Sequence, residues 1–155
     1  MRFVIIGGTP SEIEARRADL AAVGLADRVR FVGKVAPDRL PAYLSASDVL
    51  LSPRIAGVNT PLKLLDYLKA GRAIVATDTE ANRLILDDTT AELVAPEPAA
   101  FAAGIVALAD DVDRRESIAR SGRRRVDEVY NFEVFTERLG RCYAGLGLPV
   151  GERTE

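Results

Sequence analysis

Short apolar runs alternate along the chain with longer segments whose apolar residues recur at helical spacing. The short runs are continuous, rich in β-branched residues and bounded by glycine, proline or polar residues, which is typical of strands in a parallel sheet. They predict five strands, at residues 3–8, 29–33, 49–53, 73–78 and 91–96. Because the first run contains no polar position, we expect it to form a buried strand.

The longer segments predict helices between and after these strands. Ser11 is a candidate N-cap with Glu14 at the third helical position, the pattern of a capping box, and Gly24 is a candidate C-terminal stop. The helices are expected at residues 11–24, 38–46, 60–71, 80–87 (a single turn), 99–111, 111–130 and 132–146. The helix over 111–130 is expected to break near Ser121 and Gly122.

Strands that alternate with helices build βαβ units, so the sequence predicts an α/β fold. We expect a three-layer sandwich, with a mostly parallel sheet of about five strands and helices on both faces. In such sheets, ligands bind beyond the carboxyl ends of the strands. The loops after Gly7, Gly33, Pro53 and Asp78 are therefore the expected binding region.

Composition narrows the possible chemistry. The 155 residues predict one domain over residues 1–146, followed by a flexible tail at 147–155. The net charge of −2 argues against a nucleic-acid partner. One cysteine and no histidine exclude a disulfide framework, the usual zinc sites and histidine-based triads, so we expect no metal site.

Apolar run lengths bear on the compartment. No run reaches the roughly 18 residues of a membrane span, and the apolar stretch at the start is too short for a signal peptide. We therefore expect a cytoplasmic protein.

The segment over residues 52–71 carries the clearest chemical signal. Thr60 is a good N-cap, Pro61 a favoured first helical residue, and Lys63 then falls at the third helical position. Cations are disfavoured there because a helix N-terminus is already partly positive. A bound phosphate or diphosphate would explain the lysine; the alternative is that Lys63 simply points into solvent.

Asp66 follows Lys63 by three residues on the same helix face. The two side chains could form a local ion pair, or Asp66 could accept hydrogen bonds from ligand hydroxyls while Lys63 holds a phosphate. Two glycine turns, GGTP at 7–10 and GKV at 33–35, either bring backbone close to a ligand or are tight strand-to-helix turns.

Three segments together resemble a known family. GLADRVRFVGKVAPDRLPAYLSASDVLLSP (24–53), NTPLKLLDYLKAGRAIVATD (59–78) and AELVAPEPAAFAAGIVALADD (91–111) are similar to the C-terminal half of retaining GT-B glycosyltransferases, family 4 type (glycosyl transferases group 1). The resemblance implies a Rossmann-like domain that binds a UDP- or GDP-sugar as co-substrate, with no further cofactor. It covers residues 3–145 and implies a role in polysaccharide biosynthesis.

The resemblance also implies roles for individual residues. Lys63 and Arg54 would be catalytic and stabilise the leaving diphosphate, while Asp66 would bind the ribose. The remaining donor-binding positions would be Asn59, Thr60, Pro61 and Leu62 at the diphosphate, Gly7, Gly8 and Thr9 near the phosphates, and Gly33, Lys34 and Val35 at the base.

Two departures from the family pattern stand out. Many members carry a second acid eight positions before the ribose-binding one, where this chain has Val58. The family also has an N-terminal acceptor domain and one more strand and helix before the first strand seen here. We therefore expect either that the strands at 3–8 and 49–53 pair directly, or that a second chain or a homodimer completes the sheet.

Three other features carry expectations. The arginines at 114, 115, 120, 123, 124 and 125 could meet an anionic membrane or a lipid-linked acceptor, which leaves a peripheral position at the inner membrane face open, but six nearby acids favour a solvated helix. Tyr130, Phe132, Phe135 and Tyr143 are expected to pack on the sheet or to form an apolar strip for a partner. Cys142 is expected to be buried.

The resemblance implies the donor-binding domain of an enzyme that acts on an acceptor glycan or a lipid-linked acceptor. Two other functions remain open. One is a non-catalytic nucleotide-binding module that needs a partner chain for the acceptor half. The other is a generic Rossmann or flavodoxin-like domain, which the missing G-x-G-x-x-G motif disfavours.

Overall fold

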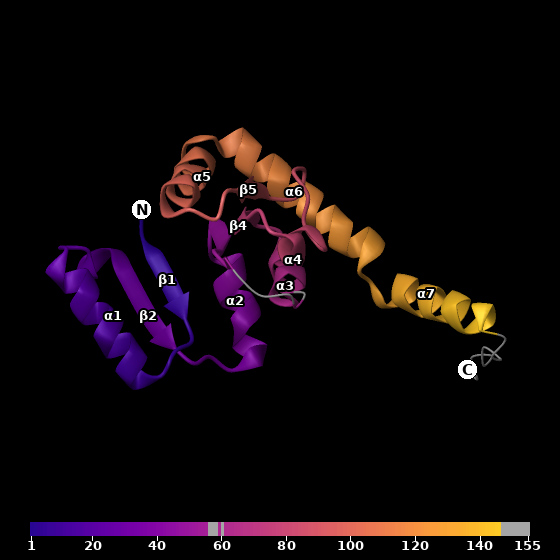
Figure 1. Cartoon of the computed structure of the whole chain (residues 1–155), viewed down its shortest axis with the longest axis horizontal. Coiled ribbons are helices and arrows are strands. Elements are labelled where there is room, and N and C mark those ends of the chain that lie inside the picture. Colours follow the sequence, from indigo (N-terminus) through magenta and orange to yellow (C-terminus); the bar gives the residue numbers. More distant parts are fainter. Residues whose placement is uncertain (56–58, 60, 147–155) are drawn as a thin grey trace. The chain divides into compact units, whose positions relative to one another are not determined.

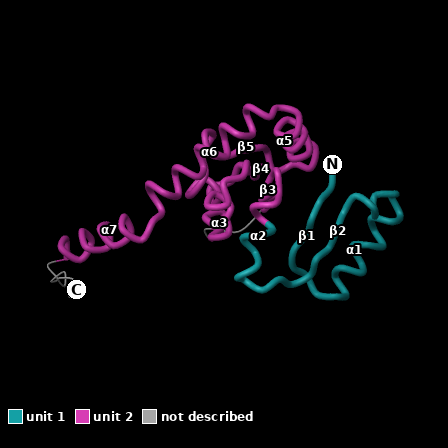
Figure 2. Tube along the Cα trace, turned by 180° about the vertical axis from the view of Figure 1, so that it is seen from behind, with its two compact units in different colours: residues 1–43 teal, residues 44–155 magenta. Residues whose placement is uncertain are grey.

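The chain forms two compact units, which Figure 2 shows in different colours. They comprise Met1–Tyr43 and Leu44–Glu155, and each is described here by itself. The computed structural model describes residues 1–55, 59 and 61–146. The expected tail at 147–155 lies outside these residues, and one domain over 1–146 remains a prediction.

The first unit is a parallel strand pair with one long helix (Figure 1). Strand β1 (Phe3–Ile6) pairs in parallel with β2 (Val29–Gly33), and helix α1 (Pro10–Ala22) connects them. Short 3-10 turns lie at Ala26–Arg28 and Pro37–Arg39.

Helix α1 begins two residues earlier than predicted. Thr9, not Ser11, is the N-cap, and it forms a capping box with Glu12 instead of Glu14. The Thr9 amide donates to Glu12 Oε2 at 2.7 Å. Pro10 explains the shift, because its fixed φ favours the first helical position and leaves the residue before it extended.

The predicted stop at Gly24 is confirmed. Gly24 has a φ of 71° and donates its amide to Ala21 O, while the Leu25 amide donates to Leu20 O. These two bonds form a Schellman motif, which satisfies the last carbonyls of α1.

Within the first unit by itself, strand β1 is not buried, although the sequence predicts a buried strand. Val4 and Ile5 point to opposite faces and are 54% and 45% exposed. Among the described residues, β1 is hydrogen-bonded only to β2. A pairing of the strands at 3–8 and 49–53 would join the two units, so this pairing and the alternative of a second chain stay predictions. A continuous apolar run requires both faces to be covered, and within this unit neither face of β1 is fully closed.

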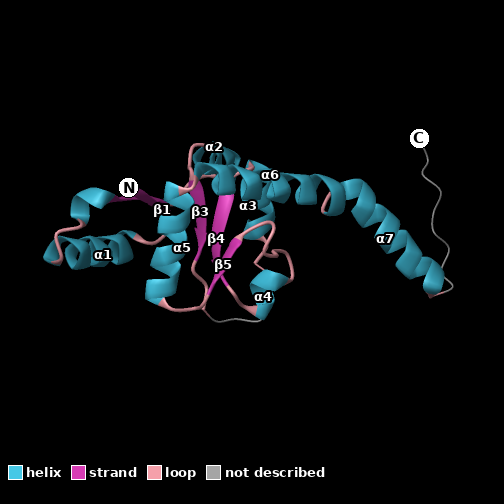
Figure 3. Cartoon of the chain, turned by 90° about the horizontal axis from the view of Figure 1, so that it is seen from above, coloured by secondary structure: helices cyan, strands magenta, loops and turns pink. Residues whose placement is uncertain are grey.

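The second unit is a three-stranded parallel sheet with helices on both faces (Figure 3). Its strand order is β3 (Val49–Ser52), β4 (Ala73–Thr77), β5 (Glu92–Val94). Helix α2 (Leu40–Ser45) spans the boundary between the units. The other helices are α3 (Lys63–Ala70), α4 (Glu80–Arg83), α5 (Pro98–Asp110), α6 (Val112–Val129) and α7 (Phe132–Gly145).

The central strand β4 is buried along its whole length. On one face, Ala73 and Val75 pack in a core with Leu108 of α5 and Ile118 of α6. Figure 3 shows α5 and α3 on opposite sides of the strands, and α3 buries Leu64 and Leu68. The predicted parallel α/β architecture with five strands is therefore confirmed, with the strands divided between two sheets.

Helix α6 is continuous, so the predicted break near Ser121 and Gly122 is wrong. Gly122 is buried where α6 meets α3, and a Cβ placed on it would lie 2.8 Å from Leu68 Cδ2. This glycine permits close helix packing and does not end the helix.

Helix α7 runs on from α6, away from β3–β5 (Figure 1), and buries no residue. Phe132, Phe135 and Tyr143 are 77%, 58% and 45% exposed, so they form an apolar strip and do not pack on the sheet. Cys142 is exposed as well, contrary to the prediction. None of the helices in the described residues has the length and apolar character needed to cross a membrane.

Gly104 provides a test of how tightly α5 packs on the sheet. A Cβ on this residue would lie 2.8 Å from Val94 Cγ1 and 3.3 Å from Val75 Cγ1. Valine side chains have one preferred rotamer and yield poorly, and overpacking costs about 1–3 kcal/mol, against a helix-propensity gain of about 1 kcal/mol. We expect Gly104→Ala to lower the free energy of unfolding by about 1 kcal/mol in urea titrations.

The matched control is Gly145→Ala, since a Cβ there would meet no atom within 4 Å. It should leave the unfolding free energy unchanged or raise it slightly. Equal behaviour of the two variants would contradict close packing at Gly104.

Candidate functional site

The carboxyl ends of β3 and β4 meet the start of α3 in the second unit. Ser52 ends β3, Thr77 ends β4, and α3 begins at Lys63. This is the edge of a parallel sheet where ligands are expected to bind.

Helix α3 starts later than the sequence predicts. Lys63 is the first helical residue and not the third, and Leu62 occupies the N-cap position without a side-chain cap. The amides of Leu64 and Leu65 donate to Pro61 O and Leu62 O, so the chain enters the helix through tight i→i+3 turns. Lys63 therefore still lies in the first turn, while the predicted N-cap Thr60 lies outside the described residues.

Lys63 is the cation at this helix start, and its pKa depends on its surroundings. Although the Lys63 side chain is exposed overall, burial of its ammonium and, second, the positive charge of Arg54 lower the pKa of Lys63. The ammonium lies 5.7 Å from the centroid of the Tyr67 ring, within the range of a cation–π contact. Lys63 forms no ion pair with an acid in the described part of the chain.

Arg54 is held by buried polar groups on β4 and α4. The Thr77 hydroxyl donates to the Arg54 carbonyl, and Asn82 Nδ2 donates to Thr77 O at 2.7 Å. The Arg54 guanidinium donates from Nη1 to Asn59 O at 3.0 Å. Thr77 and Asn82 thus position the loop that carries Arg54, a role that the sequence analysis missed.

Polar atoms remain unsatisfied beside this network. Within the described residues, Ser52 Oγ and Asn82 Oδ1 are buried without a hydrogen-bond partner. Ser52 and Thr77 are polar residues at the ends of otherwise apolar strands. This position was the sequence signal that could have predicted the network, because buried polar groups need hydrogen-bond partners.

Asp66 is exposed on the same helix and does not form an ion pair with Lys63. Of the two alternatives open for this residue, the local ion pair is therefore absent. Burial and, second, the charge of Asp66 raise the pKa of Tyr67. Tyr67 donates to Leu51 O at 3.5 Å, which links α3 to β3.

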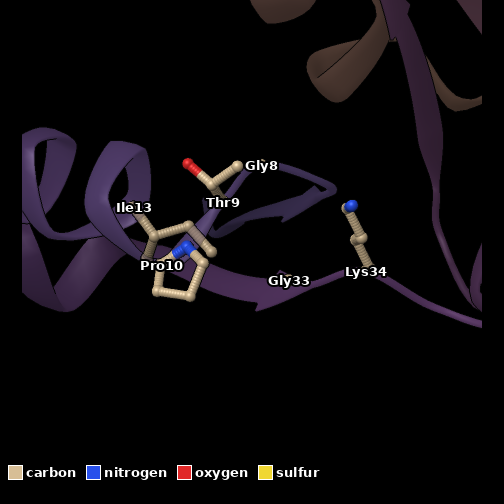
Figure 4. A pocket seen from close by; sticks show the side chains of 6 residues that line it. All are labelled: Gly8, Thr9, Pro10, Ile13, Gly33 and Lys34. Atoms are coloured by element: carbon tan, nitrogen blue, oxygen red, sulfur yellow. The ribbon is translucent and has the colours of Figure 1, made fainter.

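The first unit contains a separate hollow of about 290 Å³ between the two glycine turns. Figure 4 shows Pro10 and Ile13 on one side of it and Lys34 on the other. Gly8, Thr9 and Gly33 complete the lining. The Gly7 amide donates to Gly33 O at 2.7 Å, and both glycines have positive φ, so the turns depend on residues without a Cβ.

The candidate residues thus fall into two groups. In the first unit, Gly8, Thr9, Gly33 and Lys34 line one hollow, while Gly7 and Val35 flank it in sequence. In the second unit, the group comprises Arg54, Asn59, Pro61, Leu62, Lys63 and Asp66. Thr60 and Val58 lie outside the described residues.

The chain is similar to known proteins in sequence and in fold. The family described as glycosyl transferases group 1 matches residues 1–111. A phosphatidyl-myo-inositol mannosyltransferase of Mycolicibacterium smegmatis is 28% identical over 97% of this chain and 39% of its own length. The chain therefore spans about two fifths of that relative.

Two solved structures share the fold. The Anabaena protein HepE in complex with UDP has a TM-score of 0.84 at 16% identity, over 94% of this chain and 41% of that one. The C-terminal domain of a glycosyl transferase group 1 protein from Francisella tularensis has a TM-score of 0.71 at 24% identity, over 84% of this chain and 69% of that one. The fold is that of the C-terminal half of a GT-B glycosyltransferase. On the family match over residues 1–111, the chain belongs to the group 1 glycosyl transferases.

Proposed function

We propose that this chain is the donor-binding half of a retaining glycosyltransferase that uses a UDP- or GDP-sugar. One observation carries the proposal: Lys63 lies in the first turn of α3 and forms no ion pair within the described residues, while burial and, second, the charge of Arg54 lower its pKa.

Like charges beside a helix N-terminus repel each other and the helix dipole. A diphosphate placed there would turn three unfavourable interactions into favourable ones, since its negative charge would attract both cations and the partly positive end of the helix dipole. The unsatisfied Ser52 Oγ at the end of β3 and Asn82 Oδ1 on α4, whose amide nitrogen donates to Thr77 O at the end of β4, offer further polar atoms at this edge.

The other candidate residues would recognise the rest of the donor. Asp66 has a carboxylate free of ion pairs in the described structure, so it can accept hydrogen bonds from ribose hydroxyls. The segment from Asn59 to Leu62 would face the diphosphate. In the first unit, Gly7, Gly8 and Thr9 would serve the phosphates, and Gly33, Lys34 and Val35 the base.

In the reaction, a sugar passes from the diphosphate to an acceptor hydroxyl. Negative charge develops on the leaving diphosphate, and Lys63 and Arg54 would stabilise that charge electrostatically. Binding of a diphosphate and a ribose would explain why the site combines two cations, backbone amides and one carboxylate.

The acceptor half would come from residues outside this chain segment or from a second chain. The Mycolicibacterium relative is named for a lipid acceptor, phosphatidyl-myo-inositol, and we propose a glycan or lipid-linked acceptor here. The proposed place is the cytoplasm, with a peripheral position at the inner membrane face if the acceptor is a lipid.

A non-catalytic nucleotide-binding module is the second candidate. It is favoured by Val58, which stands where many family members have an acid. Hydrolysis or transfer of a nucleotide sugar by the chain alone would exclude it.

Ligand-induced stabilisation tests the proposal directly. At 100 times its dissociation constant, a nucleotide should add about 2.7 kcal/mol to the unfolding free energy. We expect UDP, GDP or one of their sugars to raise the melting temperature in a thermal-shift screen. The absence of a shift with all of them would contradict the proposal.

Single substitutions on α3 should separate binding from folding. We expect Lys63→Ala to weaken nucleotide binding about tenfold and Asp66→Ala about fivefold in calorimetry, because each removes a charge-assisted hydrogen bond. Both side chains are exposed, so the melting temperature of the free protein should change little. Lys69→Ala, at the far end of the same helix, is the control and should bind normally. Unchanged affinity in both test variants would contradict the proposed roles of Lys63 and Asp66 in nucleotide binding.

The lowered pKa of Lys63 predicts a pH dependence of binding. Only the protonated ammonium attracts phosphate, so affinity should fall as the pH rises through the Lys63 pKa, which lies below the usual value of about 10.4. Arginine stays charged in this range, and Lys63→Arg should abolish the fall. Calorimetry between about pH 7.5 and pH 10 measures both profiles. Identical profiles for the wild type and Lys63→Arg would show that another group titrates.

A further inference from the structure

A second hollow lies at the opposite edge of the sheet in the second unit. Asp48 precedes β3 and Arg72 precedes β4, so both mark the amino ends of these parallel strands. The hollow measures about 360 Å³ and is lined by these two residues together with Arg115, Glu116, Arg120 and Arg123 of α6. It is separate from the edge that carries Ser52, Thr77 and Lys63.

The lining of this hollow consists mainly of small residues and arginines. Ala73, Ala119 and Gly71 also line it, and Gly71 ends α3 in the left-handed conformation. Residues 115, 119 and 123 follow one another at intervals of four along α6, so they share one face of that helix. The sequence shows the arginines of α6 but not that Arg72 joins them.

Three of the four guanidinium groups are held in place by backbone carbonyls. Arg72 Nη2 donates to Ser45 O at 2.5 Å, Arg115 Nη1 to Leu108 O at 2.8 Å and Arg123 Nη1 to Lys69 O at 2.7 Å. Carbonyl partners orient a guanidinium without neutralising its charge. The cations of this hollow are therefore arranged before any ligand binds.

The charges in the hollow are not balanced. Arg120 pairs with Glu116 at 3.1 Å and Arg123 with Asp127 at 2.8 Å. Arg72 and Arg115 form no ion pair with any described acid. The lining thus has an excess of positive charge, although the chain as a whole has a net charge of −2.

We infer that this hollow binds a phosphate-bearing anion, at a site distinct from the proposed nucleotide site. Planar guanidinium groups match the oxygens of phosphate in paired hydrogen bonds, and the volume lies at the lower end of the range of small-ligand pockets, about 300–1,000 Å³. The phosphate can belong to a soluble compound or to a lipid headgroup, and the two sources are separated by experiment.

Inorganic pyrophosphate is the soluble probe, and the measurement is its dissociation constant by calorimetry. Every variant in this experiment also carries Lys63→Ala, which minimises pyrophosphate binding at the proposed nucleotide site. The result for the hollow is then independent of the result for the nucleotide site. We expect Arg120→Gln to weaken binding and Asp48→Asn to tighten it, each by about fivefold, the effect of one charge at about 4 Å in water. Neither side chain forms a hydrogen bond with the backbone of the described residues, so folding should persist.

Arg141→Gln is the matched control. Arg141 forms an exposed i,i+4 pair with Glu137 on α7, as Arg120 does with Glu116 on α6, so the change in net charge and in pair type is the same. It should leave pyrophosphate binding unchanged.

Vesicles distinguish the lipid source. A lipid ligand predicts binding to vesicles that contain phosphatidylglycerol and no binding to vesicles of phosphatidylcholine alone. Loss of this binding in Arg120→Gln, with binding kept in Arg141→Gln, supports the site with a headgroup as its ligand. Pyrophosphate binding with the same variant pattern supports it with a soluble ligand. If neither probe binds, or if Arg120→Gln and Arg141→Gln behave alike, the inference is overturned.

Discussion

The burial of β4 is the constraint on which the second unit depends. All five of its residues are buried, with β3 and β5 at its sides and helices on both faces. A strand enclosed in this way has no freedom to shift its register, because a shift of one residue would move every side chain to the other face. Its two ends are thereby fixed, and each end carries one of the polar sites.

Helix α3 acquires its orientation from the same core. Leu64 and Leu68 are buried four residues apart, which turns Lys63 and Asp66 away from the sheet. Gly122 has no Cβ, so α6 can approach Leu68 and pack closely against α3, the helix that carries Lys63. The packing of the apolar face of α3 therefore determines where its charged groups lie.

The sequence predicted what hydrophobic pattern controls and missed what depends on distant contacts. The strand at 29–33 has the predicted bounds, because a short apolar run between polar turns has one reasonable structure. The cap of α1 was misplaced because Thr9, Ser11 and two glutamates offer competing capping boxes. The roles of Gly122, Thr77 and Arg72 depend on neighbours 23 or more residues away, which periodicity cannot show.

The length of β4 has a consequence for how the two edges of the sheet could be occupied. The first and last of its five residues are four steps of about 3.3 Å apart, which separates its ends by about 13 Å. This distance exceeds the Debye length of about 8 Å at physiological ionic strength. Salt would therefore weaken the repulsion between solvent-exposed anions held at the two edges, so one short strand would let two ligands of the same sign bind together.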